Sequence, residues 1–430
     1  MSGTGVPSEF VRIDRERNTF KVSRRAFTEP HVLEMEREAI FDKCWLYVGH
    51  ASELAKPGAF VTRAVGGRNI IFNRDAKGEI HAFLNTCPHR GMKLCRESSG
   101  SSKNFTCFYH GWVFGADGLL RDIPGREAYP EDFGCDHSAD LVPVPRLDSH
   151  RDFWFLCFDP DAISLSDYLG DAKEMISVVA DHAEEGMEIV SGAQEYGIRA
   201  NWKLIMENSL DGYHAATTHA TYFDYLRNLK LDLSLSGTGA PVDLGHGHAA
   251  IEYVGAWGRP VAKWASTMGE ENRAEVDRVF AGLVERLGEA RAKRVAHGNR
   301  NIGIFPNLVI NDTMGLVVRT FYPVATDMMH ISSWSLGPRG ESAEMRKFRL
   351  ANFIEFLGPG GLATPDDVEA LENCQRGFAN LKEAPWTDLS KGLGRPGGEQ
   401  RMDDEAQTRT FWLEWDRRMH DVVPLAEAAE

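Results

Sequence analysis

Two short segments of the chain each combine a cysteine and a histidine at close spacing. Cys87 and His89 are separated by one residue and Cys107 and His110 by two, with seventeen residues, Gly- and Ser-rich in their middle, between the pairs. Two thiolates can hold one iron and two neutral imidazoles another, which raises the reduction potential of a two-iron, two-sulfur cluster. The spacing therefore predicts a one-cluster iron–sulfur site on two loops.

A zinc ion is the closest alternative occupant for these four residues. Zinc sites with two cysteines and two histidines usually begin with a Cys-x2–4-Cys pair, whereas each pair here mixes one Cys with one His. Four unrelated core residues are the other alternative, and the repeated Cys-then-His order disfavours it. Cys95 fits no ligand position, so we expect a packed, small apolar side chain there.

A second group of possible metal ligands lies in residues 201–219, NWKLIMENSLDGYHAATTH. The imidazoles of His214 and His219 and one distant carboxylate would form the facial triad of non-haem iron(II) oxygenases. On a regular helix these two side chains point roughly 140° apart. The helix must therefore end or bend between them, where Thr217 and Thr218 are poor helix formers. Two histidines simply exposed on a helix are the alternative.

The third ligand must come from a distant part of the chain. Asp366 and Asp367, in the segment GLATPDDVEALENCQ, are the candidates. Adjacent positions of a helix point apart, so only one of the two can bind the ion. The alternative is that both are first-turn acids of a helix after Pro365, where negative charge is favourable.

Both segments resemble one enzyme family. CPHRG and CFYHGW resemble the ligand boxes of a Rieske [2Fe–2S] domain, and ENSLDGYHAATTH resembles the motif ENxxDxYHxxxxH of Rieske ring-hydroxylating oxygenase α subunits. The resemblance implies that two cysteines hold one iron of the cluster and two histidines the other. These four residues are Cys87, Cys107, His89 and His110.

The same resemblance assigns roles in the second group. His214 and His219 bind a mononuclear iron, and Asp367 is the third ligand because the family uses the second acid of such a pair. Asp211 is not a ligand; it bridges the cluster of one protomer to the iron of its neighbour. Asp366 is left as the acid of the helix terminus.

The expected fold class is α+β. We predict an all-β Rieske domain over residues 44–160 and a helix-grip-like catalytic domain with a central antiparallel sheet over residues 161–430. Residues 1–43, an N-terminal arm and a helix, belong to the catalytic domain. Strands are expected over 302–310, 316–324 and 330–336, and one long amphipathic helix over 270–296. Residues 1–20 are expected to be a flexible arm.

Composition excludes several classes of protein. The net charge of −15, with no basic cluster, disfavours a nucleic-acid partner or a polybasic membrane anchor. Seven cysteines without a regular framework indicate a reducing compartment. The chain shows no secretory signal and no membrane-spanning run, so a cytoplasmic protein is expected.

The resemblance implies a terminal oxygenase that adds both atoms of O2 to an arene, giving a cis-dihydrodiol. No G-x-G-x-x-G fingerprint is present, so electrons must come from a separate NAD(P)H-dependent reductase, with or without a ferredoxin. An α3 or α3β3 assembly with a small β subunit is also implied. The alternatives are a Rieske monooxygenase, acting by ring monohydroxylation or O-demethylation, and a Rieske electron carrier.

Substrate evidence is thinner than the evidence for the metal sites. The second motif looks most similar to α subunits that act on substituted benzoates, such as p-cumate, benzoate and salicylate oxygenases. A carboxylated arene would need a nearby Arg or Lys, which the sequence does not identify. Residues 301–309 and 356–362 either wall an aromatic pocket or pack in the core. His246 and His248 are expected in a loop that lines the substrate channel.

Overall fold

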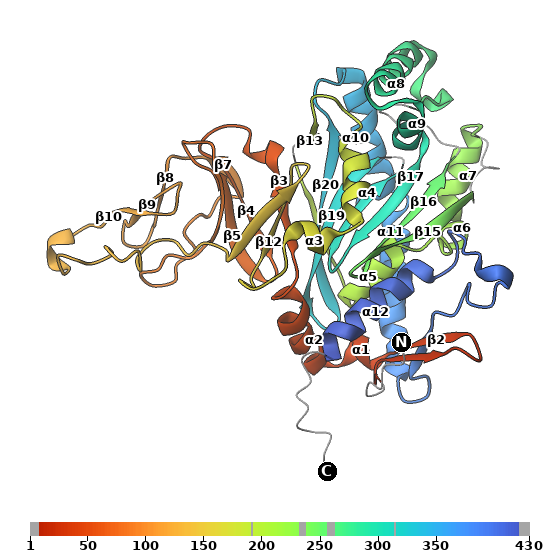
Figure 1. Cartoon of the computed structure of the whole chain (residues 1–430), viewed down its shortest axis with the longest axis horizontal. Coiled ribbons are helices and arrows are strands. Elements are labelled where there is room, and N and C mark those ends of the chain that lie inside the picture. The colour runs from red at the N-terminus through yellow and green to blue at the C-terminus, as the bar shows by residue number, and fades with distance from the viewer. Residues whose placement is uncertain (1–7, 191, 232–237, 256–262, 314, 421–430) are drawn as a thin grey trace. The chain divides into compact units, whose positions relative to one another are not determined.

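The computed structural model describes residues 8–190, 192–231, 238–255, 263–313 and 315–420 (Figure 1). The chain divides into two compact units by its internal contacts. The smaller unit comprises residues 41–165, and the larger unit comprises residues 1–40 and 166–430. The sequence predicts domain boundaries after residues 43 and 160, and these boundaries stay a prediction.

The smaller unit is built from short antiparallel strands. Its three sheets have the strand orders β6-β5-β4-β7, β10-β9-β8 and β11-β12-β3. The strands are β3 (Leu46–His50), β4 (Ala59–Val65), β5 (Arg68–Arg74), β6 (Ile80–Leu84), β7 (Ser99–Ser101), β8 (Asn104–Thr106), β9 (Val113–Gly115), β10 (Leu120–Asp122), β11 (Arg146–His150) and β12 (Phe153–Cys157). Cys87 lies just beyond β6, and Cys107 lies between β8 and β9, so short strands hold both loops.

The larger unit contains a single large antiparallel sheet (Figure 1). Its strand order is β13-β20-β19-β18-β17-β16-β15, and β14 also pairs with β20. The strands are β13 (Met187–Ile189), β14 (Gln194–Ile198), β15 (Thr238–Gly245), β16 (His248–Val254), β17 (Asn299–Ile304), β18 (Leu308–Asp312), β19 (Leu316–Ala325) and β20 (Met328–Pro338). With helices around this sheet, the predicted α+β class is confirmed.

Along the chain, helices precede the strands of the large sheet, connect some of them and follow the last one. They are α1 (Arg25–Thr28), α2 (Pro30–Glu36), α3 (Leu165–Leu169), α4 (Ala172–Ala180), α5 (Trp202–Ser209), α6 (Ala215–Thr218), α7 (Ala220–Asn228), α8 (Arg273–Leu287), α9 (Glu289–His297), α10 (Ala343–Leu357), α11 (Thr364–Gly377) and α12 (Ala406–His420). Within the described ranges, no helix is both long enough and apolar enough to cross a membrane.

Three expectations about elements are wrong in detail. The single helix expected over 270–296 is two helices, α8 and α9, separated by Gly288. The single strand expected over 302–310 is two strands, β17 and β18, which pair with each other across a turn at residues 305–307. The expected arm, residues 1–20, contains strand β1 (Val11–Asp14) and the start of β2 (Thr19–Ser23), which join β21 (Trp386–Asp388) in a separate three-stranded sheet. Residues 1–7 lie outside the described residues.

A buried carboxylate joins three helices of the larger unit. Glu36, 0% exposed, ends α2 and accepts hydrogen bonds from Trp202 Nε1 of α5 at 2.7 Å and Trp415 Nε1 of α12 at 2.8 Å. The ammonium of Lys203, also fully buried, donates to the same carboxylate. A buried charge is tolerated when it is paired and hydrogen-bonded in this way. The beginning of α5 is therefore fixed against the N- and C-terminal helices.

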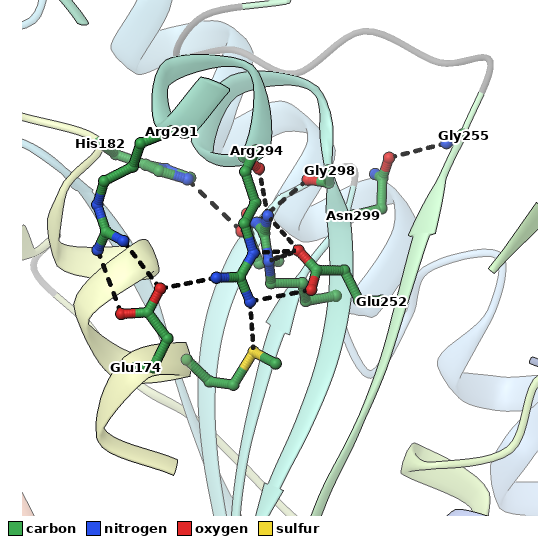
Figure 2. Close-up of polar contacts among 11 residues, drawn as sticks. Glu174, His182, Glu252, Gly255, Arg291, Arg294, Gly298 and Asn299 are labelled. Carbon is green, nitrogen blue, oxygen red and sulfur yellow. Dashed lines mark hydrogen bonds and ion pairs between the residues drawn. The ribbon is translucent and has the colours of Figure 1, made fainter. Parts of the chain in front are cut away.

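A network of ion pairs anchors α9 to the sheet and to α4 (Figure 2). Arg294 of α9 donates to Glu252 of β16 at 3.0 and 3.1 Å and to Glu174 of α4 at 2.7 Å. Arg300 of β17 is fully buried and pairs with both Glu252 and Asp312, at 2.9 and 3.0 Å. These carboxylates lie on the face of the sheet opposite to Asn301 and Asn311, because side chains alternate along a strand.

His248 has a structural role rather than the expected place in a substrate channel. It is fully buried, and its Nδ1 accepts a hydrogen bond from the Phe305 backbone N–H at 2.9 Å. Its Nε2 therefore donates to the Tyr168 carbonyl, at 2.8 Å. Burial lowers the pKa of His248 to about 4, so the ring is neutral at pH 7. His246 lies exposed in the turn between β15 and β16.

We predict that His248 makes the free energy of unfolding depend on pH between about 6.5 and 4. The unfolded state takes up a proton near pH 6.5, but the folded state does so only near pH 4. Stability is therefore lost as the pH falls through this window, by at most about 3 kcal/mol. Chemical denaturation at pH 7 and pH 5 should show a smaller pH difference for H248Q than for the wild type.

The matched control is H246Q, which changes an exposed histidine of the same turn. Its difference in unfolding free energy between pH 7 and pH 5 should equal that of the wild type. An H248Q protein with an unchanged pH difference would contradict the prediction, whatever its absolute stability.

Candidate iron centres

The two Cys/His loops of the smaller unit have matching backbone geometry. In each loop the cysteine N–H donates to the carbonyl five residues later, from Cys87 to Met92 and from Cys107 to Trp112, both at 2.8 Å. In each loop the glycine four residues after the cysteine donates back to the cysteine carbonyl. Gly91 and Gly111 both have φ +73°, a conformation that glycine adopts without strain. The two loops therefore have the same backbone hydrogen bonds, although His89 follows its cysteine by two positions and His110 follows its cysteine by three.

The side chains of the loops suit a cluster. Cys87 and Cys107 lie 2% exposed within one apolar core cluster, and the rings of His89 and His110 are 4.6 Å apart. Trp112 stacks flat on His89 at 4.9 Å. The Nδ1 atom of His89 is buried and has no hydrogen-bond partner among the described residues. An unpaired buried nitrogen is costly, and a metal bond would satisfy it.

The other cysteines differ from these two in environment. All seven lie in the described ranges, and none of them forms a disulfide there. Cys95 is buried in the same core cluster, where burial raises its pKa to about 11, which agrees with the packed apolar side chain expected. Of the aromatic residues near His110 in the sequence, Trp112 is buried, whereas Tyr109 is 52% exposed.

The larger unit places three candidate ligands on consecutive short elements and one distant helix. α5 ends at Ser209, His214 immediately precedes α6, and His219 is the junction between α6 and α7. The predicted interruption of the helix is therefore present on both sides of the four-residue α6. Asp367 comes from the first turn of α11, which begins with Thr364 and Pro365.

These three side chains converge on one point. The Nε2 atoms of His214 and His219 are 3.2 Å apart and lie 3.5 and 3.3 Å from Asp367 Oδ1. With metal–ligand bonds of about 2.1 Å, ligands at right angles are about 3.0 Å apart. The arrangement therefore fits one six-coordinate ion with its remaining positions open, the geometry of the two-histidine, one-carboxylate triad.

The structure separates the two candidate aspartates. Asp367 faces the Nε2 atoms of both histidines, whereas Asp366 Oδ2 lies 3.5 Å from Nδ1 of His219, on the far side of that ring. The side chain of Asp366 is 37% exposed and that of Asp367 is 14% exposed. Among the described residues, only Asp367 completes a three-ligand group with the two histidines.

Neighbouring residues orient two of the three candidate ligands. Asn208, in the last turn of α5, donates to Asp367 Oδ1 at 2.9 Å. Asp211 accepts from the Tyr213 backbone at 2.6 Å and from His214 Nδ1 at 3.1 Å, which leaves His214 Nε2 free for an ion. Gly212 lies against the carbonyl of Met402, which a Cβ atom would meet at 2.4 Å. This turn therefore tolerates only glycine at position 212.

The electrostatics of the site favour a cation. Burial alone would raise the pKa of Asp367, but hydrogen bonds from His214 and His219 outweigh it and hold the pKa well below its usual range. Burial alone would lower the pKa of His214, but its hydrogen bonds to Asp211 and Asp367 raise the pKa to about 9. Without a metal, the site thus keeps a charged carboxylate and attracts a proton to His214.

The three ligands face a pocket within the larger unit. Its polar lining includes Asn301, Asn311, Thr313 and Arg319, from strands β17 to β19 and the residue after β18. Its apolar lining comes from α7, α10 and β16, and includes Tyr222, Phe223, Tyr253, Phe356 and Leu357. Two segments were expected either to wall a pocket or to pack in the core. Residues 301–309 contribute Asn301 to the pocket lining, and residues 356–362 contribute Phe356 and Leu357.

Comparisons with known proteins agree with both sites. Residues 44–143 match the Rieske [2Fe-2S] domain, and residues 175–421 match the catalytic domain of the ring-hydroxylating α subunit. The chain belongs to the ring-hydroxylating α subunits. As a member of this oxygenase family it carries a Rieske [2Fe–2S] cluster and a mononuclear non-haem iron, and the family predicted from the sequence is confirmed.

Two curated relatives and one solved structure illustrate the similarity of this ring-hydroxylating α subunit. The large subunit of anthranilate 1,2-dioxygenase from Acinetobacter baylyi is 35% identical over 87% of this chain and 80% of its own length. Toluate 1,2-dioxygenase subunit alpha from Pseudomonas putida is 33% identical over 89% of this chain and 84% of its own length. Naphthalene 1,2-dioxygenase from Rhodococcus sp., bound to indole, superposes with a TM-score of 0.80 at 28% identity, over 94% of this chain and 95% of its own.

Sequence reasoning missed most of the pocket lining. Asn311, Thr313 and Arg319 come from strands about 100 residues beyond the histidine motif, and no local pattern links them to it. One signal was available for Arg319: it is a single charge within the apolar run LVVRTFYPV. A charged residue in a strand that packs on both faces is costly unless it has a function or a partner.

Replacing Asp367 should remove one iron from each chain. D367A deletes the carboxylate that faces both histidines, so iron content should fall from three atoms per chain to two, with the Rieske spectrum unchanged. D366A is the matched control, because Asp366 lies on the far side of His219, and it should keep three. Metal analysis with electron paramagnetic resonance of the reduced cluster makes the measurement; loss of the third iron in D366A alone would reverse the assignment.

Proposed function

We propose that the protein is the terminal oxygenase of a multicomponent system that cis-dihydroxylates the ring of a substituted benzoate. The observation that carries the proposal is the convergence of His214, His219 and Asp367 at the edge of a pocket with aromatic walls. In this proposal these three residues hold the mononuclear iron, and Cys87, Cys107, His89 and His110 hold the cluster.

The two metal centres would have different roles, and different residues of the chain serve each of them. When bound, the cluster supplies single electrons, and the iron supplies the chemistry that activates O2. His214, His219 and Asp367 would hold the iron at the edge of the pocket, which leaves the rest of the pocket for the substrate. Asn208 and Asp211 fix the orientation of Asp367 and His214 through hydrogen bonds. Tyr222, Phe223 and Phe356 provide apolar surface for an aromatic ring and exclude water from it.

The substrate class is supported by the two relatives compared above. Both are named for aromatic carboxylates, anthranilate and toluate, and both are named as 1,2-dioxygenases. The second candidate, a monooxygenase that hydroxylates once or demethylates, uses the same iron ligands. The product distinguishes the two, because only the dioxygenase places both oxygen atoms of one O2 on neighbouring ring carbons.

Asp211 is proposed to link the two kinds of centre between protomers. Its carboxylate accepts from His214 and is 27% exposed, so it can also accept from a cluster histidine, His89 or His110, of a neighbouring protomer. This role requires an oligomer, for which we propose α3, or α3β3 with a small β subunit. The electrons come from NAD(P)H through a separate reductase, with or without a ferredoxin.

The function is tested with the purified protein, a matching reductase and NADH. O2 uptake should depend on substituted benzoates, with one NADH and one O2 consumed per cis-diol formed. Labelled 18O2 should deliver both atoms to the product. A single labelled oxygen would favour the monooxygenase. Two irons per chain and no O2 uptake with any arene would favour the electron carrier.

The bridge is tested with D211N. This variant keeps the shape of the side chain and removes its charge, so both iron centres should remain while turnover falls by about 10- to 100-fold. Stopped-flow absorbance should show slower oxidation of the reduced cluster when O2 and substrate are added. D224N, an exposed site on α7, is the control. Loss of the mononuclear iron in D211N would mean that Asp211 supports the metal site only.

A further inference from the structure

A buried arginine of the sheet lines the pocket. Arg319 lies in the middle of β19, where it pairs with Val309 of β18 and Ser333 of β20. It is the one arginine or lysine in the pocket lining formed by the described residues. Two positions before it on β19, Val317 pairs with Asn311, so Arg319 shares the face of the sheet that carries Asn301 and Asn311.

The guanidinium of Arg319 has hydrogen-bond donors that the protein does not use. Arg319 is 4% exposed, and its Nε and Nη2 atoms are buried with no hydrogen-bond partner among the described residues. In the same part of the chain, no carboxylate forms an ion pair with it. An arginine this deeply buried is normally paired, because an unpaired buried charge is strongly unfavourable. The guanidinium of Arg319 is therefore suited to an anionic ligand that enters the pocket.

The acidic residues near Arg319 in the fold are engaged elsewhere. Glu252 pairs with Arg294 (Figure 2), and Asp312 pairs with Arg300. By the strand register, both acids lie on the face of the sheet opposite to Arg319. At the metal site, Asp367 Oδ1 faces the two histidines and Asn208. Arg319 therefore differs from Arg300, which is equally buried but has two carboxylate partners from the protein.

We propose that Arg319 binds the carboxylate of the aromatic substrate, an inference that rests on the proposed function and names its specificity residue. Nε and Nη2 form one edge of the guanidinium fork, whose geometry matches a carboxylate and gives two parallel hydrogen bonds. Thr313, in the same lining, has a buried hydroxyl that finds no hydrogen-bond partner within the described ranges, and it can add a donor. The ring then lies between this polar wall and the aromatic residues.

This arrangement selects against neutral arenes as well as for carboxylates. A neutral ring that fills the pocket keeps water from Arg319 and leaves its charge without a partner, which costs binding energy. A benzoate supplies the missing charge and both acceptors. We therefore expect the wild-type protein to bind benzoate at least about 30-fold more tightly than benzamide, its neutral analogue of the same shape.

The test compares R319M and R319K with the wild-type holoenzyme. Equilibrium dialysis with labelled benzoate should show binding at least about 30-fold weaker in R319M, whereas binding of benzamide should be unchanged or tighter. R319K keeps the charge but not the fork, so its benzoate affinity should be intermediate. In the coupled assay, R319M should shift its preference from benzoate to toluene.

A stability measurement separates substrate binding from a structural role. Methionine is apolar and of similar length, so R319M removes an unpaired buried charge and should melt at or above the temperature of the wild type without substrate. R300M, which breaks the paired arginine of the neighbouring network, is the matched control and should melt lower. Benzoate should raise the melting temperature of the wild type but not that of R319M.

The outcomes distinguish this inference from the function it rests on. Wild-type oxidation of benzoates with equal benzoate affinity in R319M would overturn the role of Arg319 and leave the function intact. A wild-type protein that holds three irons but binds and oxidises no aromatic carboxylate would overturn the substrate class. A lower melting temperature in R319M, with equal losses for benzoate and benzamide, would make Arg319 a structural residue.

Discussion

The catalytic centre depends on an interruption of the helix that carries its histidines. Two imidazoles five residues apart cannot reach one ion from a straight helix. The chain resolves this by ending the four-residue α6 between the two histidines and starting α7 after His219. A turn after the end of α5 at Ser209 leads into His214. Asp211 and Gly212 make the turn possible, one by accepting backbone N–H groups and the other by approaching the carbonyl of Met402.

The rest of the larger unit holds this turn in place from both ends. Glu36 fixes the beginning of α5 between the N- and C-terminal helices, so that the end of the helix has a defined position. α11 supplies Asp367 from its first turn, where the acid is compatible with the helix terminus as well as with the metal site. Residues far apart in the sequence thus share one rigid arrangement, which a metal site with open positions requires.

The two centres solve the same problem of loop geometry differently. The cluster loops are short and almost identical in their backbone hydrogen bonds, so local sequence sets their shape. The mononuclear site combines one local motif with a carboxylate about 150 residues away, so the sheet and helices set its shape. The pocket depends even more on tertiary structure than the mononuclear site does. Strands β17 to β19 contribute one lining residue each, Asn301, Asn311 and Arg319, and these meet because they lie on one face of the sheet.

The sequence alone was sufficient to predict the family and the α+β class, which are confirmed, and to propose the metal-binding residues of the local motifs. Cys87, His89, Cys107, His110, His214 and His219 lie in two short segments whose chemistry depends on spacing along the chain. Tertiary structure brought Asp367, rather than Asp366, to the Nε2 atoms of both histidines, placed His248 in the core and brought Arg319 to the pocket. These outcomes depend on which side chains share a face and which polar atoms find partners. Such properties come from strand pairing and helix packing, which spacing along the chain does not encode.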